Sequence, residues 1–313
     1  MITRLGLAIL AALALLSPAA VPAQGQPAAA PSMRIAKGIT QKLSAHVWAI
    51  PANLRGGVAN VGIVVGSRGV LVIESGLGKP NGQVILDEVR RIAGMDRRLY
   101  VIATHSHPEH IGGEQAFPAS AIILRPLGQQ LDVDSAKGKR LIEAFRGMSP
   151  DNAVLLKDFA YRQADIILSG PTTTLDLGGV TVDIIDASPA HTDGDAAFLV
   201  REDGVLFTGD VVQQNFVPVL GGEHSTTASW LAQIDKLEKL LATIIVPSHT
   251  AITNRQAFAD MRAMVSFVRD DWAAIKVRGL VDKAAADQLV ADVKARFPAC
   301  GNADLLRMYI GRL

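Results

Sequence analysis

Cysteine is almost absent from this chain, because Cys300 is the only one in 313 residues. An internal disulfide is therefore impossible, and so is a metal site built from several thiolates. Cys300 lies in the C-terminal part of the chain, far from the motifs described below, so we expect no role for it as a nucleophile.

The chain also lacks an excess of charge of either sign, with 31 basic residues (Lys and Arg) against 30 acidic ones (Asp and Glu). Proteins that bind nucleic acids or anionic surfaces usually carry a basic excess or a basic patch. We therefore expect a small-molecule substrate and no nucleic-acid partner.

The apolar run near the N-terminus, residues 5–16, is too short to span a bilayer comfortably. It follows Arg4 and precedes small residues at positions 21–23, which is typical of a cleavable secretory signal. We expect a signal peptide at residues 1–23 and a flexible linker rich in Pro, Ala and Gln at residues 24–32. The predicted location is the periplasm or the exterior, with no stable membrane insertion after cleavage; the alternative is a retained membrane anchor.

Histidine, in contrast, is concentrated in one place. Of the seven histidines, His105, His107 and His110 lie within six residues, and Glu109 sits between the last two. The preceding apolar run predicts a buried strand, and Pro108 disfavours a helix through the motif, so we expect a tight loop at the end of a strand. Neutral imidazole is the commonest ligand for zinc-like metals, and carboxylate serves beside it. The stretch therefore predicts a metal site.

Three later segments also follow predicted strands and carry residues of the same kind. They contain His191 within residues 190–195, Asp210 at the end of residues 207–210, and His249 at the end of residues 246–249. Since each candidate ligand comes after a strand, we expect them to converge on one edge of the predicted sheets.

Together these four motifs resemble those of the metallo-β-lactamase superfamily, over about residues 45–255. The resemblance implies an α/β fold, the four-layer αββα sandwich, for a domain at residues 33–255. Helical periodicity from about residue 256 to residue 313 predicts a helical C-terminal extension.

The resemblance also implies two divalent metal ions, which we expect to be zinc. The implied ligands are, for the first metal, His105, His107 and His191; for the second, Glu109, His110 and His249; and for both, Asp210. Two such metals share a water and lower its pKa from 15.7 to about 7. The implied function is a metallohydrolase whose metal-bridging hydroxide cleaves an ester, thioester, lactone or amide bond of a small molecule, with Asp210 and Glu109 as catalytic residues.

Some positions depart from the family's usual motifs. Glu109 stands where aspartate is usual, so the second metal could be shifted, weaker or absent, and in a mononuclear site Glu109 could shuttle protons instead. Glu74 replaces an aspartate that supports the metal ligands. His224, in a glycine-rich loop, is a candidate substrate contact, and its alternative is a surface residue. His46 receives no ligand role.

Several alternative functions remain open from the sequence. Known β-lactamases of the superfamily tend to carry cysteine or serine where this chain has Asp210, so a β-lactamase is the second hydrolase hypothesis. A mononuclear-iron sulfur dioxygenase and a non-catalytic binding protein are the others. The charged helical segment at residues 127–165 is either a lid over the site or a solvated pair of helices.

Overall fold

The computed structural model describes residues 32–53 and 57–313. The predicted signal peptide and all of the predicted linker except Ser32 lie outside the described residues. Within the described ranges, no helix is both long enough and apolar enough to cross a membrane.

The first half of the chain forms a mixed seven-stranded sheet in sequential order. Its first four strands are antiparallel neighbours, and the strands from the fourth to the seventh are parallel neighbours. The strands are β1 (Gln41–Lys42), β2 (Val47–Ile50), β3 (Val61–Val65), β4 (Gly69–Ile73), β5 (Arg98–Ile102), β6 (Ile122–Pro126) and β7 (Ile166–Leu168).

The second half forms a five-stranded sheet in the order β12-β11-β10-β9-β8. Only the β11–β12 pair is parallel among these neighbours. The strands are β8 (Thr172–Asp176), β9 (Thr181–Asp186), β10 (Ala196–Val200), β11 (Val205–Gly209) and β12 (Ile244–Pro247).

The side chains of β4 point alternately to the two faces of the first sheet, and both faces are covered. Val70 and Val72 pack with helix α1 (Gly78–Ala93), whereas Leu71 and Ile73 pack against residues of the second sheet. Successive side chains of a strand point to opposite faces, so a strand buried on both sides is apolar throughout. β4 is such a strand, because all five of its residues are buried.

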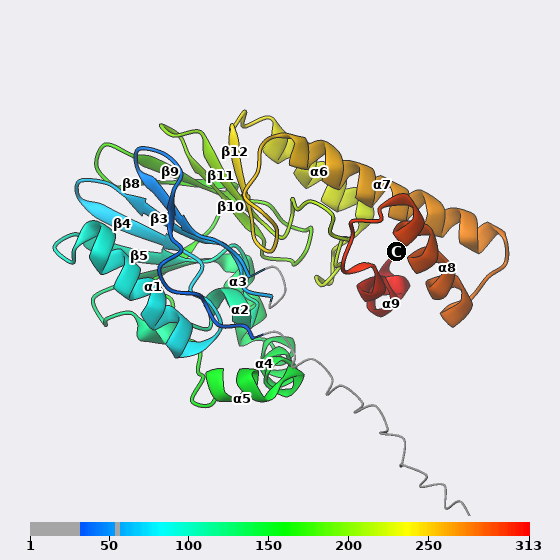
Figure 1. Ribbon diagram of the computed structural model, residues 1–313, viewed down its shortest axis with the longest axis horizontal. Helices are drawn as coiled ribbons and strands as arrows, with labels where there is room; N and C mark the ends of the chain where they lie inside the picture. The colour runs from blue at the N-terminus through cyan, green and yellow to red at the C-terminus, as the bar shows by residue number, and fades with distance from the viewer. Residues whose placement is uncertain (1–31, 54–56) are drawn as a thin grey trace, which may run out of the picture. The chain divides into compact units, whose positions relative to one another are not determined.

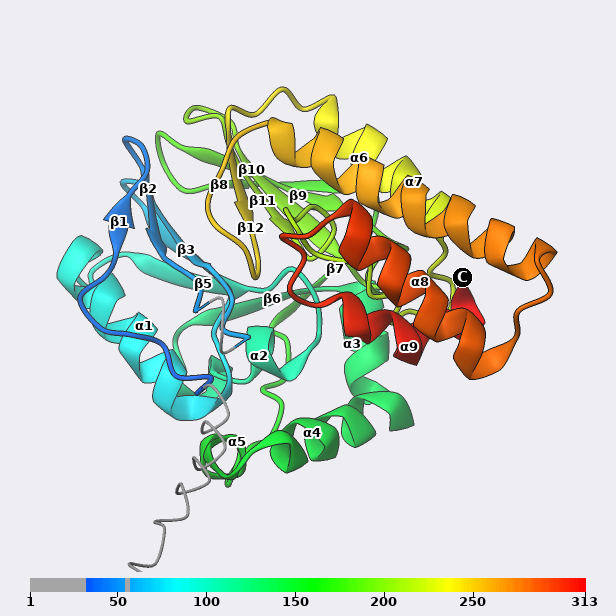
Figure 2. The same ribbon diagram turned by 45° about the vertical axis from the view of Figure 1, so that its right-hand side comes forward.

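The second sheet is covered on its outer face by α6 (Thr227–Glu238) and α7 (Gln256–Val277), which lie side by side in Figures 1 and 2. Trp230 of α6 and Phe258 of α7 pack there with Leu206 of β11. Helix, sheet, sheet and helix thus form four layers with three apolar interfaces. The predicted αββα sandwich is confirmed.

Pro108 predicts a loop through the whole ligand motif, and the structure differs from this prediction. Residues 108–111 form a one-turn helix, α2 (Pro108–Ile111), with Pro108 in its first turn. Proline lacks an N–H, but the first N–H groups of a helix have no intrahelical partner, so proline is accepted there. The loop prediction was therefore wrong for Glu109 and His110, which lie on this helix.

The segment at residues 127–165 contains three helices, α3 (Leu127–Asp134), α4 (Ala136–Met148) and α5 (Pro150–Leu155). Val133 of α3 packs against Ala103 and Ile111, which flank the histidine motif. This segment therefore covers the ligand motif on one side, and much of α4 faces solvent.

The C-terminal segment is helical, as predicted. It contains α7, α8 (Asp282–Arg296) and α9 (Leu306–Tyr309), with short 3₁₀ turns around α9 (Figure 2). Val268 of α7, Leu289 of α8 and Leu306 of α9 form an apolar cluster with Val217, which follows the Asp210 motif. The extension thus packs against a loop that also serves the site described below.

The α1–sheet interface can be tested with two matched valine substitutions. Val89 of α1 is 1% exposed, whereas Val277 at the end of α7 is 90% exposed. Val89→Ala removes buried methyl groups and should lower the free energy of unfolding by about 1.5–3 kcal/mol. Val277→Ala should change it by less than about 0.5 kcal/mol. Denaturant midpoints measure both, and equal effects would contradict the packing described here.

Candidate metal centre

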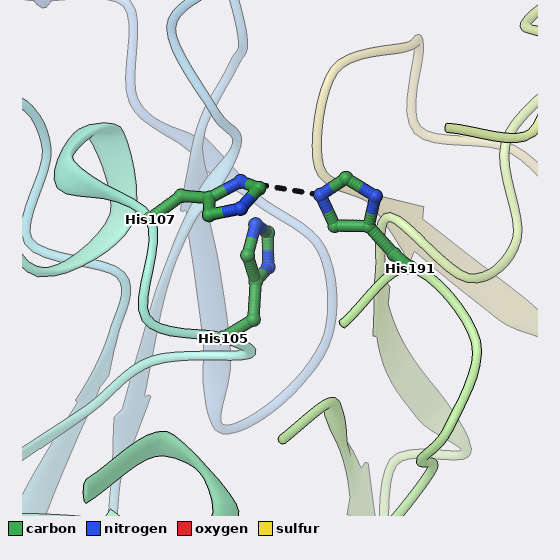
Figure 3. Close-up of side chains that lie close together, drawn as sticks. All are labelled: His105, His107 and His191. Carbon is green, nitrogen blue, oxygen red and sulfur yellow. Dashed lines mark hydrogen bonds between the residues drawn. The ribbon is translucent and has the colours of Figure 1, made fainter. Parts of the chain in front are cut away.

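Three imidazoles from two separate loops meet at one point (Figure 3). His105 and His107 follow β5, and His191 follows β9. One possible ligand atom from each lies within 4.8 Å of the other two. His107 Nδ1 and His191 Nε2 are 3.2 Å apart. The structure therefore brings together the three residues predicted for the first metal.

A second group adjoins the first. Ligand atoms of Glu109, His110 and His249 lie within 4.8 Å of one another, and so do those of His105, His110 and Asp210. The two carboxylate oxygens of Asp210 face different imidazoles, at 3.6 Å from His191 Nε2 and 3.5 Å from His249 Nε2. Asp210 thus stands between the two groups, where a bridging ligand belongs.

The outer nitrogens of three imidazoles already have partners. His110 Nδ1 lies 3.0 Å from Glu74 Oε2, His191 Nδ1 lies 2.7 Å from the Val219 carbonyl oxygen, and His105 Nδ1 lies 3.2 Å from the Thr104 hydroxyl. Metal-bound histidines usually donate their other N–H in this way, which fixes both ring orientation and tautomer. Each ring therefore presents its Nε2 as the candidate ligand atom.

The inner side of the site holds buried polar atoms without a hydrogen-bond partner among the described residues. These atoms are His105 Nε2, Glu109 Oε2, His110 Nε2 and Asp210 Oδ1. A buried unsatisfied polar atom costs about 1–3 kcal/mol, and native proteins rarely tolerate several together. Nitrogen and carboxylate donors in this number match the preferences of zinc-like cations. The donor set therefore fits a binuclear metal site.

Charge states in the site follow from burial and from its neighbours. Burial lowers the pKa values of His105 and His107 well below the usual value, so both rings are neutral and keep a lone pair. Burial alone would raise the pKa of Asp210, but nearby histidines, His249 foremost, lower it to about 2. Burial raises the pKa of Glu109 to about 7. Asp210 is thus ionised, and Glu109 titrates near neutrality.

Glu74 occupies the supporting position predicted for it. It directly follows β4 and has a positive φ of 73°. Its Oε1 accepts hydrogen bonds from the Thr104 amide at 3.2 Å and the Thr104 hydroxyl at 2.6 Å, while Oε2 pairs with His110. One buried carboxylate therefore links the start of the histidine motif to a ligand on α2.

The structure places His224 at the surface. Its side chain is 74% exposed, and its Nδ1 lies 3.3 Å from Asp193. His224 belongs to none of the three candidate ligand groups found among the described residues. Its predicted substrate contact therefore stays a prediction. His46, given no ligand role, pairs with Asp203 at 3.1 Å.

Sequence reasoning did not identify the role of Val219 or that of Lys137. The Val219 carbonyl orients His191, and Lys137 donates to the Gly221 carbonyl, two residues further along the same loop. A backbone carbonyl leaves no trace in residue type, so nothing in the sequence points to Val219. Lys137 stands among several charged residues of α4, and its spacing does not distinguish it from the others.

A model of a known protein family matches this chain, and the match agrees with the fold and the donor groups described above. Residues 54–249 match the model of the metallo-beta-lactamase superfamily. The chain belongs to this superfamily. The predicted family is thereby confirmed.

Two alkylsulfatases resemble this superfamily member. The linear primary-alkylsulfatase of Pseudomonas sp. is 21% identical over 277 residues, which cover 78% of this chain and 51% of the relative. The chain thus spans about half the length of this curated relative. The structure of the stereoselective inverting sec-alkylsulfatase from Pseudomonas sp. matches with a TM-score of 0.65 and 16% identity, over 87% of this chain and 50% of that one.

A third relative is a smaller solved structure, which matches a smaller share of this chain. The metallo-beta-lactamase from Pontibacter korlensis matches with a TM-score of 0.55 and 18% identity, over 72% of this chain and 98% of its own. The share matched to the sec-alkylsulfatase, in contrast, exceeds what residues 1–255 alone could supply. That likeness therefore extends into the C-terminal helices. Family membership and the alkylsulfatase relatives support the predicted class, a metallohydrolase.

The role of Glu74 can be tested with the substitution Glu74→Gln, which keeps the size of the side chain and removes its charge. Glutamine has only one side-chain oxygen, so it cannot accept hydrogen bonds from both Thr104 and His110 as the carboxylate does. Metal affinity should therefore fall about 10–100-fold. Competition with a chromophoric chelator measures the affinity. Glu88→Gln on α1, where Glu88 pairs with Arg91, is the matched control and should leave it unchanged. Equal affinity in both variants would contradict the proposed support.

Proposed function

We propose that this superfamily member is a periplasmic or secreted hydrolase with two bound zinc ions, acting on an ester, thioester, lactone or amide bond of a small molecule. Among these bonds we propose esters, and sulfate monoesters first. The observation that carries the proposal is the convergence of seven ligand-type residues, five buried and two partly buried, some with unsatisfied inner atoms. The choice of sulfate rests on the two alkylsulfatases, of which the sec-alkylsulfatase structure shares the fold beyond residue 255.

Two divalent cations would supply an activated water and polarise the bond to be cleaved. The chain's own residues hold and orient that centre. Asp210, ionised between the two histidine groups, would be the shared ligand. Glu109, which lies with His110 and His249 in the second group, would be a ligand of the second cation.

The proposed location rests on residues 1–23 of the sequence. A positive start, a short apolar core and small residues at positions 21–23 support a secretory signal. Fractionation of cells that produce the full chain tests this proposal. The mature protein should be in the periplasm or the medium and should begin near residue 24; a chain retained in the cytoplasm with its first residues intact would contradict it.

A second candidate function is hydrolysis of β-lactams. The observation in its favour is the fold match to the Pontibacter korlensis metallo-beta-lactamase, which covers 98% of that protein. A mononuclear-iron sulfur dioxygenase is less well supported, because the described structure assembles a complete second group in Glu109, His110 and His249. The sulfate-ester hypothesis is preferred because its relatives match more of this chain.

The proposed function is tested by metal content and a substrate panel. Protein purified without chelator should contain about two zinc ions per chain. It should hydrolyse an alkyl sulfate such as octyl sulfate faster than a lactone, a thioester or a chromogenic cephalosporin. Removal of the metal should abolish activity, and zinc should restore it. About one iron per chain would contradict the proposal, and preference for the cephalosporin would favour the second candidate.

Matched histidine variants separate the metal centre from general stability. His107→Ala removes a proposed ligand and should lower both zinc content and kcat/KM, the latter by more than about 100-fold. His46→Ala changes a histidine that pairs with Asp203 outside the site and should leave both nearly unchanged. Retention of full zinc content and activity in His107→Ala would contradict its assignment as a ligand.

A further inference from the structure

A small pocket of about 10 Å³, which has room for about one water molecule, lies directly beside the first group of imidazoles. It is lined by Ser106, His107, Asp132, Lys137, Gly138 and Leu141. One wall is thus the ligand motif itself, and the other is formed by α3 and α4. The pocket has no room for a whole substrate, so a substrate would meet Lys137 at the mouth of the pocket, where this residue is exposed.

Lys137 is the lysine among the residues that line this pocket. It lies in the first turn of α4, and its Nζ donates a hydrogen bond of 2.7 Å to the Gly221 carbonyl oxygen. The Gly221 amide in turn donates to the His191 carbonyl oxygen at 2.9 Å. These contacts tie the ammonium group to the segment after Asp210, which is itself bonded to the loop that carries His191.

The side chain of Lys137 is exposed to solvent. An ammonium group has three donors, and the described contacts use one of them, for Gly221. The group can therefore bind an anion without losing its anchor.

Two carboxylates lie in the same region and oppose an anion. Asp132 accepts a hydrogen bond from Ser106, and Asp193 accepts from the amides of Glu223 and His224. Lys137 lowers the pKa of both carboxyls, although burial outweighs it at Asp132, where the pKa is raised. Lys137 offsets part of the negative charge of these two carboxylates.

We propose that Lys137 binds the anionic group of the substrate and so selects esters that carry a negative charge next to the bond to be cleaved. A sulfate monoester carries this charge on its terminal oxygens. The ammonium group of lysine is a compact positive charge that can bind such oxygens. This inference rests on the proposed hydrolase function, but anion binding can be measured separately.

The kinetic test compares two lysines of the same helix. Lys137→Met should lower kcat/KM for octyl sulfate about 10–100-fold, because a hydrogen bond to a charged group is lost. It should change kcat/KM for a neutral octanoate ester less than about threefold. Lys139→Met, also on α4, should leave both unchanged. Equal losses on the charged and the neutral ester would overturn the proposal.

The binding test uses inorganic sulfate and the zinc-loaded full-length protein, measured by calorimetry. Lys137→Met should bind sulfate at least about tenfold more weakly than the parent and Lys139→Met proteins. Lys137→Arg keeps the charge and should bind within about threefold of the parent. Thermal unfolding of each variant checks that the fold is retained.

The outcomes separate the subsite from the proposed function. If Lys137→Met weakens sulfate binding but the parent protein hydrolyses no sulfate ester, the function fails and the anion subsite stands. If Lys137→Met binds sulfate as tightly as Lys139→Met, the subsite is overturned even where sulfate esters are hydrolysed. A loss in Lys137→Arg as large as that in Lys137→Met would also overturn it, because charge would then not be the deciding property.

Discussion

Buried ligand atoms that have no hydrogen-bond partner impose the central constraint on this molecule. Nε2 of His105 and His110, together with one oxygen each of Glu109 and Asp210, are shielded from water and left unsatisfied by the surrounding residues. Such atoms are costly unless a cation binds them. The surrounding contacts, from Glu74 to the Val219 carbonyl, serve to hold these atoms toward one point.

The sandwich supplies the geometry for this convergence. β5 leads to His105, β11 leads to Asp210, and β12 leads to His249, so residues far apart in sequence leave the two sheets at the same edge. The apolar interface between the sheets fixes the distance across which these loops meet. The C-terminal helices take part indirectly, because they pack against Val217, two residues before the carbonyl that orients His191. Site and fold therefore share their stabilising contacts.

Charge is distributed unequally around the centre. Neutral His105 and His107 and an ionised Asp210 belong to the candidate metal site, while Lys137 on α4 adds a positive group on the side of His107. A positive group beside a metal pair favours substrates that carry their own negative charge. The alkylsulfatase relatives and the position of Lys137 are the two grounds for the proposed preference for sulfate esters.

Local sequence determined much of this protein. Apolar runs located the strands, and the family motifs located both the sandwich and the seven residues that the structure groups together, because these depend on residue type and short spacing. Tertiary structure decided the rest. Pro108 begins a helix where the sequence indicated a loop, Val219 acts through a carbonyl that any residue carries, and His224 faces solvent. Lys137 lies near His107 only because α4 packs there, and residue spacing in the sequence does not show this packing.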